Sequence, residues 1–178
     1  MRRDDIAASS LAKGTVRILR RQEELPLLRE HLLRLDRLSR YDRFHGFVDD
    51  DFIERYARKC ADNGTVIIGY LEGDRVRGAA ELHPPEQSQD LQPEAAFSVE
   101  VPVRRRGVGS ALFRKLIAEA QARGYRSLRI TTGSQNEAMR ALANKFGADL
   151  SFRYGESTGT IDLTGQRRPE AAWSPAAA

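Results

Sequence analysis

Residues 101–112 read Val-Pro-Val-Arg-Arg-Arg-Gly-Val-Gly-Ser-Ala-Leu and stand between a strand-like apolar run and a segment with helical periodicity. Gly107 and Gly109 lie where the strand gives way to the helix. Because glycine has no side chain, several backbone N–H groups can converge there on one anion, and the helix N-terminus adds about half a positive charge. Three arginines at 104–106 add full charges at the same point. The stretch therefore predicts a site for a pyrophosphate group.

Strand and helix signals alternate on both sides of this turn. Alternating apolar residues predict strands at 14–19, 65–71, 75–82, 94–100, 127–132, 149–154 and 158–163. Helical spacing predicts two helices at 23–38 and 49–61, and a third that begins at 107 and ends at Gly124. A fourth helix is predicted from a capping box at 134–137 to Gly147. An irregular link is expected at 40–46 and a polar loop at 84–93. The order β-α-α-β-β-β-α-β-α-β-β predicts an α/β domain with a mixed sheet and helices on both faces.

Length and composition are those of one globular domain: 178 residues, 40% hydrophobic and 30% charged. We expect the domain at 13–164, with flexible tails at 1–12 and 165–178. No apolar run approaches the ~20 residues of a membrane span, and the first residues lack the apolar core of a secretion signal. The single cysteine, Cys60, excludes an internal disulfide and favours a cytoplasmic location. We interpret it as an incidental helix residue.

The formal net charge of +4 arises from 29 basic and 25 acidic residues. The two signs are interspersed, and no run of Lys or Arg exceeds three. This pattern is typical of a solvated surface, so we expect no nucleic-acid partner and no membrane partner. A local basic site for an anionic ligand explains the charge at least as well.

Two common phosphate-binding motifs do not fit the glycine turn. A P-loop would end in Gly-Lys-Ser/Thr, which is absent here. A dinucleotide-binding turn would need a third glycine at position 112, where Leu112 stands, and would follow the first strand of a repeated β-α-β unit. Glycines also close strand–helix turns for packing reasons alone, so the turn acquires meaning only with its surroundings.

With its surroundings, the turn resembles the signature of one enzyme family. Residues 104–109, Arg-Arg-Arg-Gly-Val-Gly, are similar to the (Gln/Arg)-x-x-Gly-x-(Gly/Ala) pattern of the GNAT superfamily of N-acetyltransferases. Residues 94–100 resemble that family's fourth strand, and 136–147 resemble its last helix. The resemblance covers roughly residues 14–163. Residues 38–45, Leu-Ser-Arg-Tyr-Asp-Arg-Phe-His, loosely resemble a region of bacterial protein-lysine acetyltransferases and their stand-alone relatives.

The resemblance implies an enzyme that transfers the acetyl group of acetyl-CoA to a primary amine by direct attack in a ternary complex. The amine would belong to a protein lysine or to a small molecule. The pyrophosphate of the donor would lie on the N–H groups of the turn, and its pantetheine arm would pair with the end of the preceding strand like an added strand. The implied cofactor-binding residues are Val99, Val101, Arg104, Arg105, Arg106, Gly107, Val108, Gly109, Ser110 and Asn136.

Glu94 matches the catalytic glutamate of the protein-acetyltransferase-like members. An amine with a pKa near ~10 is mostly protonated at neutral pH, so a base is useful before it can attack a thioester. On a strand, Glu94 shares one face with Glu100. Glu100 and Glu81 are alternative bases, and the other interpretation is that all three are solvated carboxylates at strand ends.

One position departs from the family pattern. Many members carry a tyrosine seven residues after the asparagine of the last helix, as the acid for the departing thiolate. Ala143 occupies this position, so the general acid is unassigned. The departure keeps a second function open, a non-catalytic acetyl-CoA-binding sensor. Asn136 itself has a second interpretation as a polar residue at a helix N-terminus.

Histidines His31, His45 and His83 are scattered without metal-ligand spacing, so we expect no metal site. Tyr41 and His45 lie in the region where the fold varies with its substrate, and they are candidates either for the acceptor pocket or for the surface. Dimers are common in families of this kind, which leaves a homodimer open.

Overall fold

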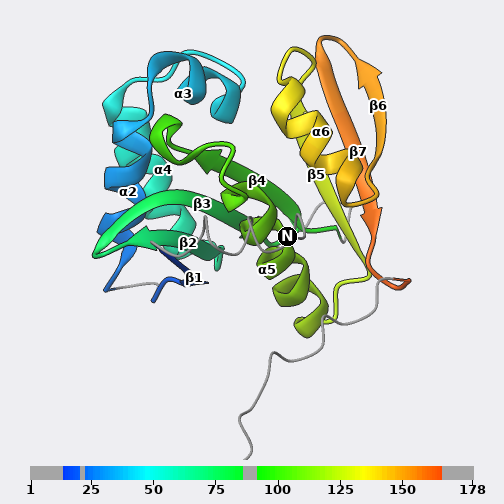
Figure 1. The fold of residues 1–178 in the computed structure, drawn as a ribbon, viewed down its shortest axis with the longest axis horizontal. Coiled ribbons are helices and arrows are strands. Elements are labelled where there is room, and N and C mark those ends of the chain that lie inside the picture. The colour runs from blue at the N-terminus through cyan, green and yellow to red at the C-terminus, as the bar shows by residue number, and fades with distance from the viewer. Residues whose placement is uncertain (1–13, 21–22, 86–91, 166–178) are drawn as a thin grey trace, which may run out of the picture.

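The sequence correctly predicts the architecture, a mixed sheet with helices on both faces (Figure 1). The computed structural model describes residues 14–20, 23–85 and 92–165. The expected N-terminal tail, the expected C-terminal tail beyond Gly165 and the centre of the loop expected at 84–93 lie outside the described residues.

The sheet contains seven strands in the order β1-β2-β3-β4-β5-β7-β6. All neighbouring strands are antiparallel except β4 and β5, which are parallel. In chain order the elements are β1 (Thr15–Ile18), α2 (Leu25–Arg34), α3 (Arg37–Phe44), α4 (Asp50–Asp62), β2 (Val66–Glu72), β3 (Arg75–His83), β4 (Glu94–Val99), the 3-10 turn η1 (Val101–Val103), α5 (Val108–Ala122), β5 (Ser127–Gly133), α6 (Glu137–Lys145), β6 (Asp149–Arg153) and β7 (Glu156–Asp162).

Strands β4 and β5 pair only over a short stretch. Their register joins Glu94 to Arg129 and Ala95 to Ile130, and no further pair follows although β4 continues to Val99. The two strands therefore diverge in the middle of the sheet, and backbone groups on their facing edges are left without a ladder partner. Figure 1 shows β4 and β5 separating toward the end of the molecule that carries α3 and the start of α6.

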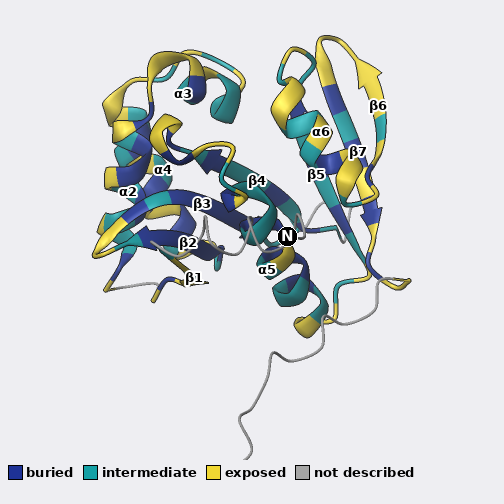
Figure 2. Ribbon diagram, viewed as in Figure 1, coloured by how far each residue is buried: buried dark blue, intermediate teal, exposed yellow. Residues whose placement is uncertain are grey.

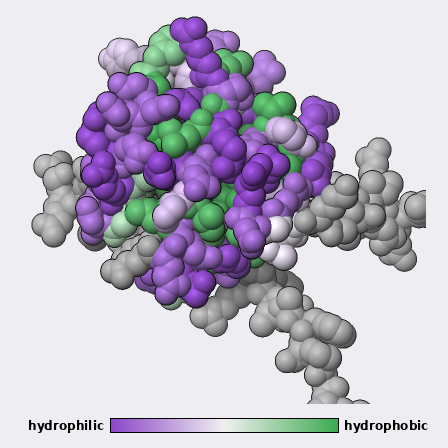
Figure 3. Space-filling model, turned by 90° about the vertical axis from the view of Figure 1, so that its left-hand side faces the viewer, coloured by the Kyte–Doolittle hydropathy of each residue, from purple (hydrophilic) through white to green (hydrophobic). Residues whose placement is uncertain are grey.

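Two apolar cores lie on opposite faces of the sheet, as the two-residue period of the strands requires. Figure 2 shows the dark buried residues concentrated along β2, β3 and the sheet-facing sides of the helices. The core under α5 includes Ile68, Tyr70, Ala80, Leu82, Phe113 and Leu116. The core under α2 and α4 includes Leu28, Leu32, Ile53, Ile67, Leu71 and Ala79. Seen from the side that carries α2 and α4, the surface is mainly hydrophilic, with small groups of apolar side chains (Figure 3).

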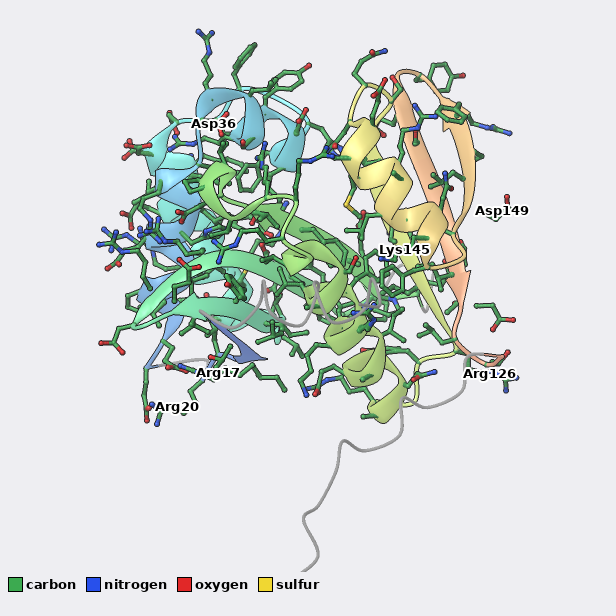
Figure 4. All side chains as sticks on the ribbon, viewed as in Figure 1. Arg17, Arg20, Asp36, Arg126, Lys145 and Asp149 are labelled. Carbon is green, nitrogen blue, oxygen red and sulfur yellow. The ribbon has the colours of Figure 1, made fainter. Side chains whose placement is uncertain are left out.

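The helix expected at 23–38 and the irregular link expected at 40–46 are wrong. The chain forms two helices there, α2 and α3, because Leu35 is extended (ψ 134°) and Asp36 begins a new helix. The Asp36 carboxylate accepts hydrogen bonds from the N–H groups of Leu38 and Ser39, at 3.1 and 3.0 Å, which caps α3. Figure 4 shows Asp36 at the junction of the two helices.

The capping box expected at 134–137 is also wrong. Asn136 is the N-cap of α6, and its side chain accepts the N–H of Met139 at 3.0 Å. Asparagine is as good an N-cap as serine, and the acidic first residue Glu137 suits the positive end of the helix dipole. The helix therefore begins at Glu137, later than the box would place it.

Candidate active site

The turn between β4 and α5 presents a row of unpaired backbone N–H groups. Its backbone is left-handed at Arg105 (φ 58°) and at Gly107 (φ 81°). The first bond of α5 runs from the N–H of Ala111 to the carbonyl of Gly107, at 3.0 Å, so the N–H groups of residues 108–110 have no partner within the helix. Among the described residues, 105–107 donate no backbone hydrogen bond either. Such a concavity attracts anions, and the helix dipole adds to the attraction. The geometry suits the pyrophosphate site that the sequence predicts.

The three arginines of the turn differ in what they contact. The Arg104 side chain donates to the carbonyl of Val99 at 3.0 Å and to the hydroxyl of Ser39 at 2.6 Å, which ties the turn to α3. Arg106 forms an ion pair with Glu72 at 3.1 Å. Arg105 has no ion pair or side-chain hydrogen bond within the described residues. Arg105 is therefore the arginine whose charge is available for a ligand without breaking an existing contact.

A further cation lies beside the turn and was not singled out from the sequence. Lys145, at the end of α6, donates from Nζ to the hydroxyl of Ser110 at 3.0 Å. Figure 4 shows Lys145 at the end of α6 that faces α5. The approach of the two helices depends on Gly109, because a Cβ there would lie 3.3 Å from Cδ2 of Leu142. The only signal in the sequence was a lysine in the last turn of the family-like helix.

The predicted pantetheine contacts sit at the diverging strands. The carbonyl of Val99 accepts the Arg104 side chain, and an added strand there would share that oxygen, which has two lone pairs. Val101 lies in η1 with an exposed side chain, and its carbonyl accepts the N–H of Arg104 at 3.1 Å. Val108 is buried against the sheet as the first residue of α5, so only its backbone can face a ligand.

A cavity of about 1110 Å³ opens between α3 and α4 on one side and β4, β5 and α6 on the other. Ala96 and Phe97 of β4 and Thr131 and Thr132 of β5 line it, which places the diverging strands in its wall. Glu94 lines it as well, and its side chain is 39% exposed. Its carboxylate lies 3.6 Å from the guanidinium of Arg129 on the neighbouring strand. The predicted base therefore faces this cavity, next to the point where the strands part.

His83 lies directly opposite Glu94 in the β3–β4 register and lines the same cavity. Its Nδ1 is 3.1 Å from the hydroxyl of Thr65, and its Nε2 is 3.1 Å from the hydroxyl of Tyr56. Directly opposed residues of antiparallel strands have Cβ atoms about 5 Å apart. In the sequence His83 is one of three scattered histidines, because the pairing of β3 with β4 is not visible in the spacing.

Glu81 is buried behind this layer. Its carboxylate accepts hydrogen bonds from the Arg43 guanidinium, at 2.9 Å, and from the Tyr56 hydroxyl. Burial works to raise the pKa of Glu81, but the charge of Arg43 and the hydrogen bond from His83 outweigh it and hold the pKa below its ordinary value. Burial also raises the pKa of Tyr56 well above its ordinary value. Glu81 is therefore the anion of a closed ion pair and does not line the cavity.

Glu100 is held in a second charged cluster, also outside the cavity. It contacts His31 and Arg34 of α2, both at 3.1 Å, and Arg77 of β3 at 2.8 Å. Burial works to raise its pKa, but the hydrogen bonds from His31 and Arg77 lower it to about 2. The same His31 also contacts the hydroxyl of Ser98 at 2.9 Å. Of the three candidate bases, Glu94 alone lines the cavity.

Cys60 is a buried residue of α4 that belongs to the core under this helix and also lines the cavity. Burial, and then the charge of Glu81, raise the pKa of its thiol to about 12. The ligand atoms of Cys60, Glu81 and His83 lie within 4.8 Å of one another. However, one Glu81 oxygen already accepts from Arg43, and a protonated thiol is a poor metal ligand. The cluster fits a charge-paired network better than a metal centre.

A family model described as the acetyltransferase (GNAT) family matches residues 29–148. The chain belongs to this family. It is therefore an acyltransferase that depends on acetyl-CoA, as the resemblance implied. None of the curated proteins compared with the sequence matched it.

Solved structures share the fold at low sequence identity. The GNAT domain of S. lividans PAT aligns with a TM-score of 0.70 and 21% identity, covering 84% of this chain and 90% of that one. The putative acetyltransferase yncA from Salmonella typhimurium, solved with acetyl-CoA, aligns at 0.63 and 18%, covering 89% and 99%. A phosphinothricin acetyltransferase from Sinorhizobium meliloti, solved with acetyl-CoA, aligns at 0.62 and 17%, covering 89% and 94%. Among the described helices of this GNAT protein, none has the length and apolar character needed to cross a bilayer.

The last helix of this GNAT protein departs from the family pattern in three dimensions too. Ala143 is fully buried, so the position of the missing tyrosine is filled by core packing. Asn136 lines the cavity and caps α6 at the same time. Its amide nitrogen is not used by the cap, so both interpretations of this residue are compatible with its position.

The two candidates for the acceptor pocket, Tyr41 and His45, lie in different places. His45 lines the cavity and lies 3.3 Å from Glu156 of β7, which joins α3 to the far side of the cavity. Tyr41 is 41% exposed and instead packs on Phe47, with ring centroids 4.9 Å apart, in a separate shallow groove beside α3.

Proposed function

We propose that the protein is an N-acetyltransferase that transfers the acetyl group of acetyl-CoA directly to a primary amine, with Glu94 as the base. The observation that carries the proposal is the position of Glu94, in the wall of the cavity and beside the diverging strands. A carboxylate there can take the proton that the amine must lose before it attacks. His83, directly opposite, is held by Tyr56 and Thr65 and would keep that wall polar.

The turn before α5 would bind the donor. The free N–H groups of residues 105–110 offer several donors to a pyrophosphate, and Arg105 and Lys145 stand beside them as cations. The free edges of β4 and β5 can accept an extended arm as an added strand. The donor would then reach the cavity from the α5 side and the amine would enter between α3 and α6.

The transfer can be written as a balanced reaction. The amine nitrogen forms a bond to the thioester carbonyl carbon after its proton has passed to Glu94, directly or through a water molecule. The nitrogen, positively charged after the attack, loses its second proton to solvent. The carbon–sulfur bond then breaks, and the thiolate takes up one proton. With Ala143 buried, no side chain of α6 supplies that proton at the family position, so we infer that it comes from solvent. A thiol, with an ordinary pKa near 8.5, is a fair leaving group without an acid.

The test is Glu94→Gln, which removes the base and keeps the shape. Free thiol is followed with acetyl-CoA and a panel of primary amines, and CoA affinity is measured by calorimetry. We expect the rate to fall by about 10²–10⁴-fold, as for loss of a general base, with CoA affinity unchanged. Glu30→Gln, an exposed substitution on α2, is the matched control and leaves both unchanged.

One observation favours a second function, a non-catalytic acetyl-CoA sensor: the buried Ala143 stands where many family members carry the acid. In that case the protein senses acetyl-CoA without turning it over. Tight CoA binding, no thiol release with any amine and no effect of Glu94→Gln would select this function and reject the transferase. For the location of either activity we propose the cytoplasm, on the single unpaired cysteine alone.

A further inference from the structure

The cavity wall formed by α4 carries positive charge only. The charged residues of this helix are Asp50, Asp51, Glu54, Arg55, Arg58, Lys59 and Asp62. Arg55 and Lys59 line the cavity, and the four acids and Arg58 do not. The helix therefore segregates its charges, with its acids on other faces.

Arg55 and Lys59 are exposed, and within the described part of the chain neither side chain forms an ion pair or hydrogen bond. They stand at i and i+4 on one face, where two like charges destabilise a helix by about 0.2–0.5 kcal/mol. The helix dipole favours Lys59, in the last turn, but does nothing for Arg55 in the middle. An anionic group between the two would remove the repulsion.

The other cations of the cavity wall already have acidic partners. Arg43 is paired with Glu81 and Arg129 with Glu94. The acids that line the cavity belong to α3 and β4, on different elements from the two free cations. A bare ammonium group would be repelled by α4. An acceptor that carries both an amine and an anionic group would match both walls.

We propose that Arg55 and Lys59 form a subsite for a carboxylate or a similar oxyanion of the acceptor, so that the preferred substrate carries an anionic group as well as its reactive amine. A guanidinium binds a carboxylate through two parallel hydrogen bonds, and an ammonium group adds a third donor. This inference rests on the proposed function, since it names the substrate class of the same cavity.

The first test compares matched substrates. A series of ω-amino carboxylates of increasing chain length is set against the corresponding ω-amino amides and ω-amino phosphonates, and kcat/KM is measured for each. We expect the anionic members to be preferred by about ten- to a hundredfold, as for a charge-assisted pair. A short peptide whose acceptor lysine is followed by Glu or by Gln repeats the comparison for a protein source of the same chemistry.

The second test uses the double variant Arg55→Gln/Lys59→Gln. It should reduce kcat/KM for the preferred amino carboxylate by about ten- to a hundredfold and leave that for its amide unchanged. Arg58→Gln is the matched control, because Arg58 lies on the same helix, donates to the carbonyl of Glu54 at 3.3 Å and does not line the cavity. Circular dichroism and a melting curve verify that each variant is folded.

A binding measurement separates this subsite from the transferase activity. An amine-free carboxylate of the preferred chain length is titrated into the wild-type protein and the double variant by calorimetry. Binding that the double variant loses and Arg58→Gln keeps supports the subsite, even if no amine is acetylated and the proposed transfer fails. Equal kcat/KM for acid and amide, or equal losses in the double variant and the control, would overturn the subsite while leaving the transferase in place.

Discussion

Three glutamates, one on β3, one at the start of β4 and one directly after β4, have different surroundings. Glu94 faces the cavity, and Glu81 and Glu100 are each buried against cations supplied by α2, α3 or β3. The sequence predicts Glu94 and Glu100 on one strand at 94–100, but β4 ends at Val99 and Glu100 is the N-cap of η1. The sequence does not distinguish a catalytic base from a buried counter-ion. The cations of α2 and α3 that pair with Glu100 and Glu81 lie more than 35 positions away from them in the chain.

The charged cluster at Glu100 predicts a stability that depends on pH. An unfolded glutamate titrates near pH 4.5, whereas the folded pKa is about 2. Between these values the unfolded state binds the proton and the folded state does not, so stability falls as the pH falls from about 5 to about 2. Glu100→Gln should lower the free energy of unfolding by about 3 kcal/mol at pH 7, and the difference from wild type should shrink across that window.

Urea unfolding at a series of pH values measures this effect. Glu30→Gln, whose carboxylate is exposed and 3.9 Å from Arg34, is the control and should track the wild type at every pH. A deficit of Glu100→Gln that stays constant from neutral pH down to pH 2 would show that the ionised carboxylate is not the stabilising species.

Elements with one clear apolar face were predicted closely. The expected strands 75–82 and 127–132 became β3 and β5 with one added residue each. The failure at α2 and α3 has a local cause, since the apolar spacing continues across the break at Asp36 and hides a side-chain cap within it. A capping aspartate inside a periodic run looks like any polar residue on the solvent face.

The contact between α5 and α6 predicts the outcome of Gly109→Val. A side chain at 109 would crowd an anion on the free N–H groups, and its Cβ would press on Leu142 at 3.3 Å. We expect a severe loss of CoA affinity, of at least about 10-fold for a lost charge-assisted bond, with the fold kept. Calorimetry with CoA measures the affinity.

The double variant Gly109→Val/Leu142→Ala separates the two causes. It removes the helix–helix pressure and keeps the crowding at the turn, so the loss of affinity should persist. Recovery of wild-type affinity in the double variant would assign the effect to the tilt of α6 and not to the anion site.

The site as a whole depends on contacts between distant parts of the chain. The cavity is assembled from α3, α4, β4, β5 and α6, and His45 and Glu156 join its two sides across 111 positions of sequence. The turn at 104–110 could be predicted because its residues are contiguous. The cavity wall at Arg55, Lys59 and His83 could not, since its members meet only when β3 pairs with β4 and α4 packs on the sheet.

The pair Arg43–Glu81 anchors α3, one side of the cavity, to the centre of the sheet. Both side chains are buried, so removing one leaves an uncompensated charge, whereas removing both does not. Arg43→Met should therefore lower the free energy of unfolding by about 3–5 kcal/mol, and Arg43→Met/Glu81→Met should recover most of it. Lys115→Met, which breaks a partly buried i,i+4 pair within α5, should cost about 0.5 kcal/mol or less. Denaturant unfolding of the wild type, Arg43→Met, Glu81→Met and the double variant measures the coupling. A double variant as unstable as the sum of its two single variants would show that the two charges do not stabilise each other.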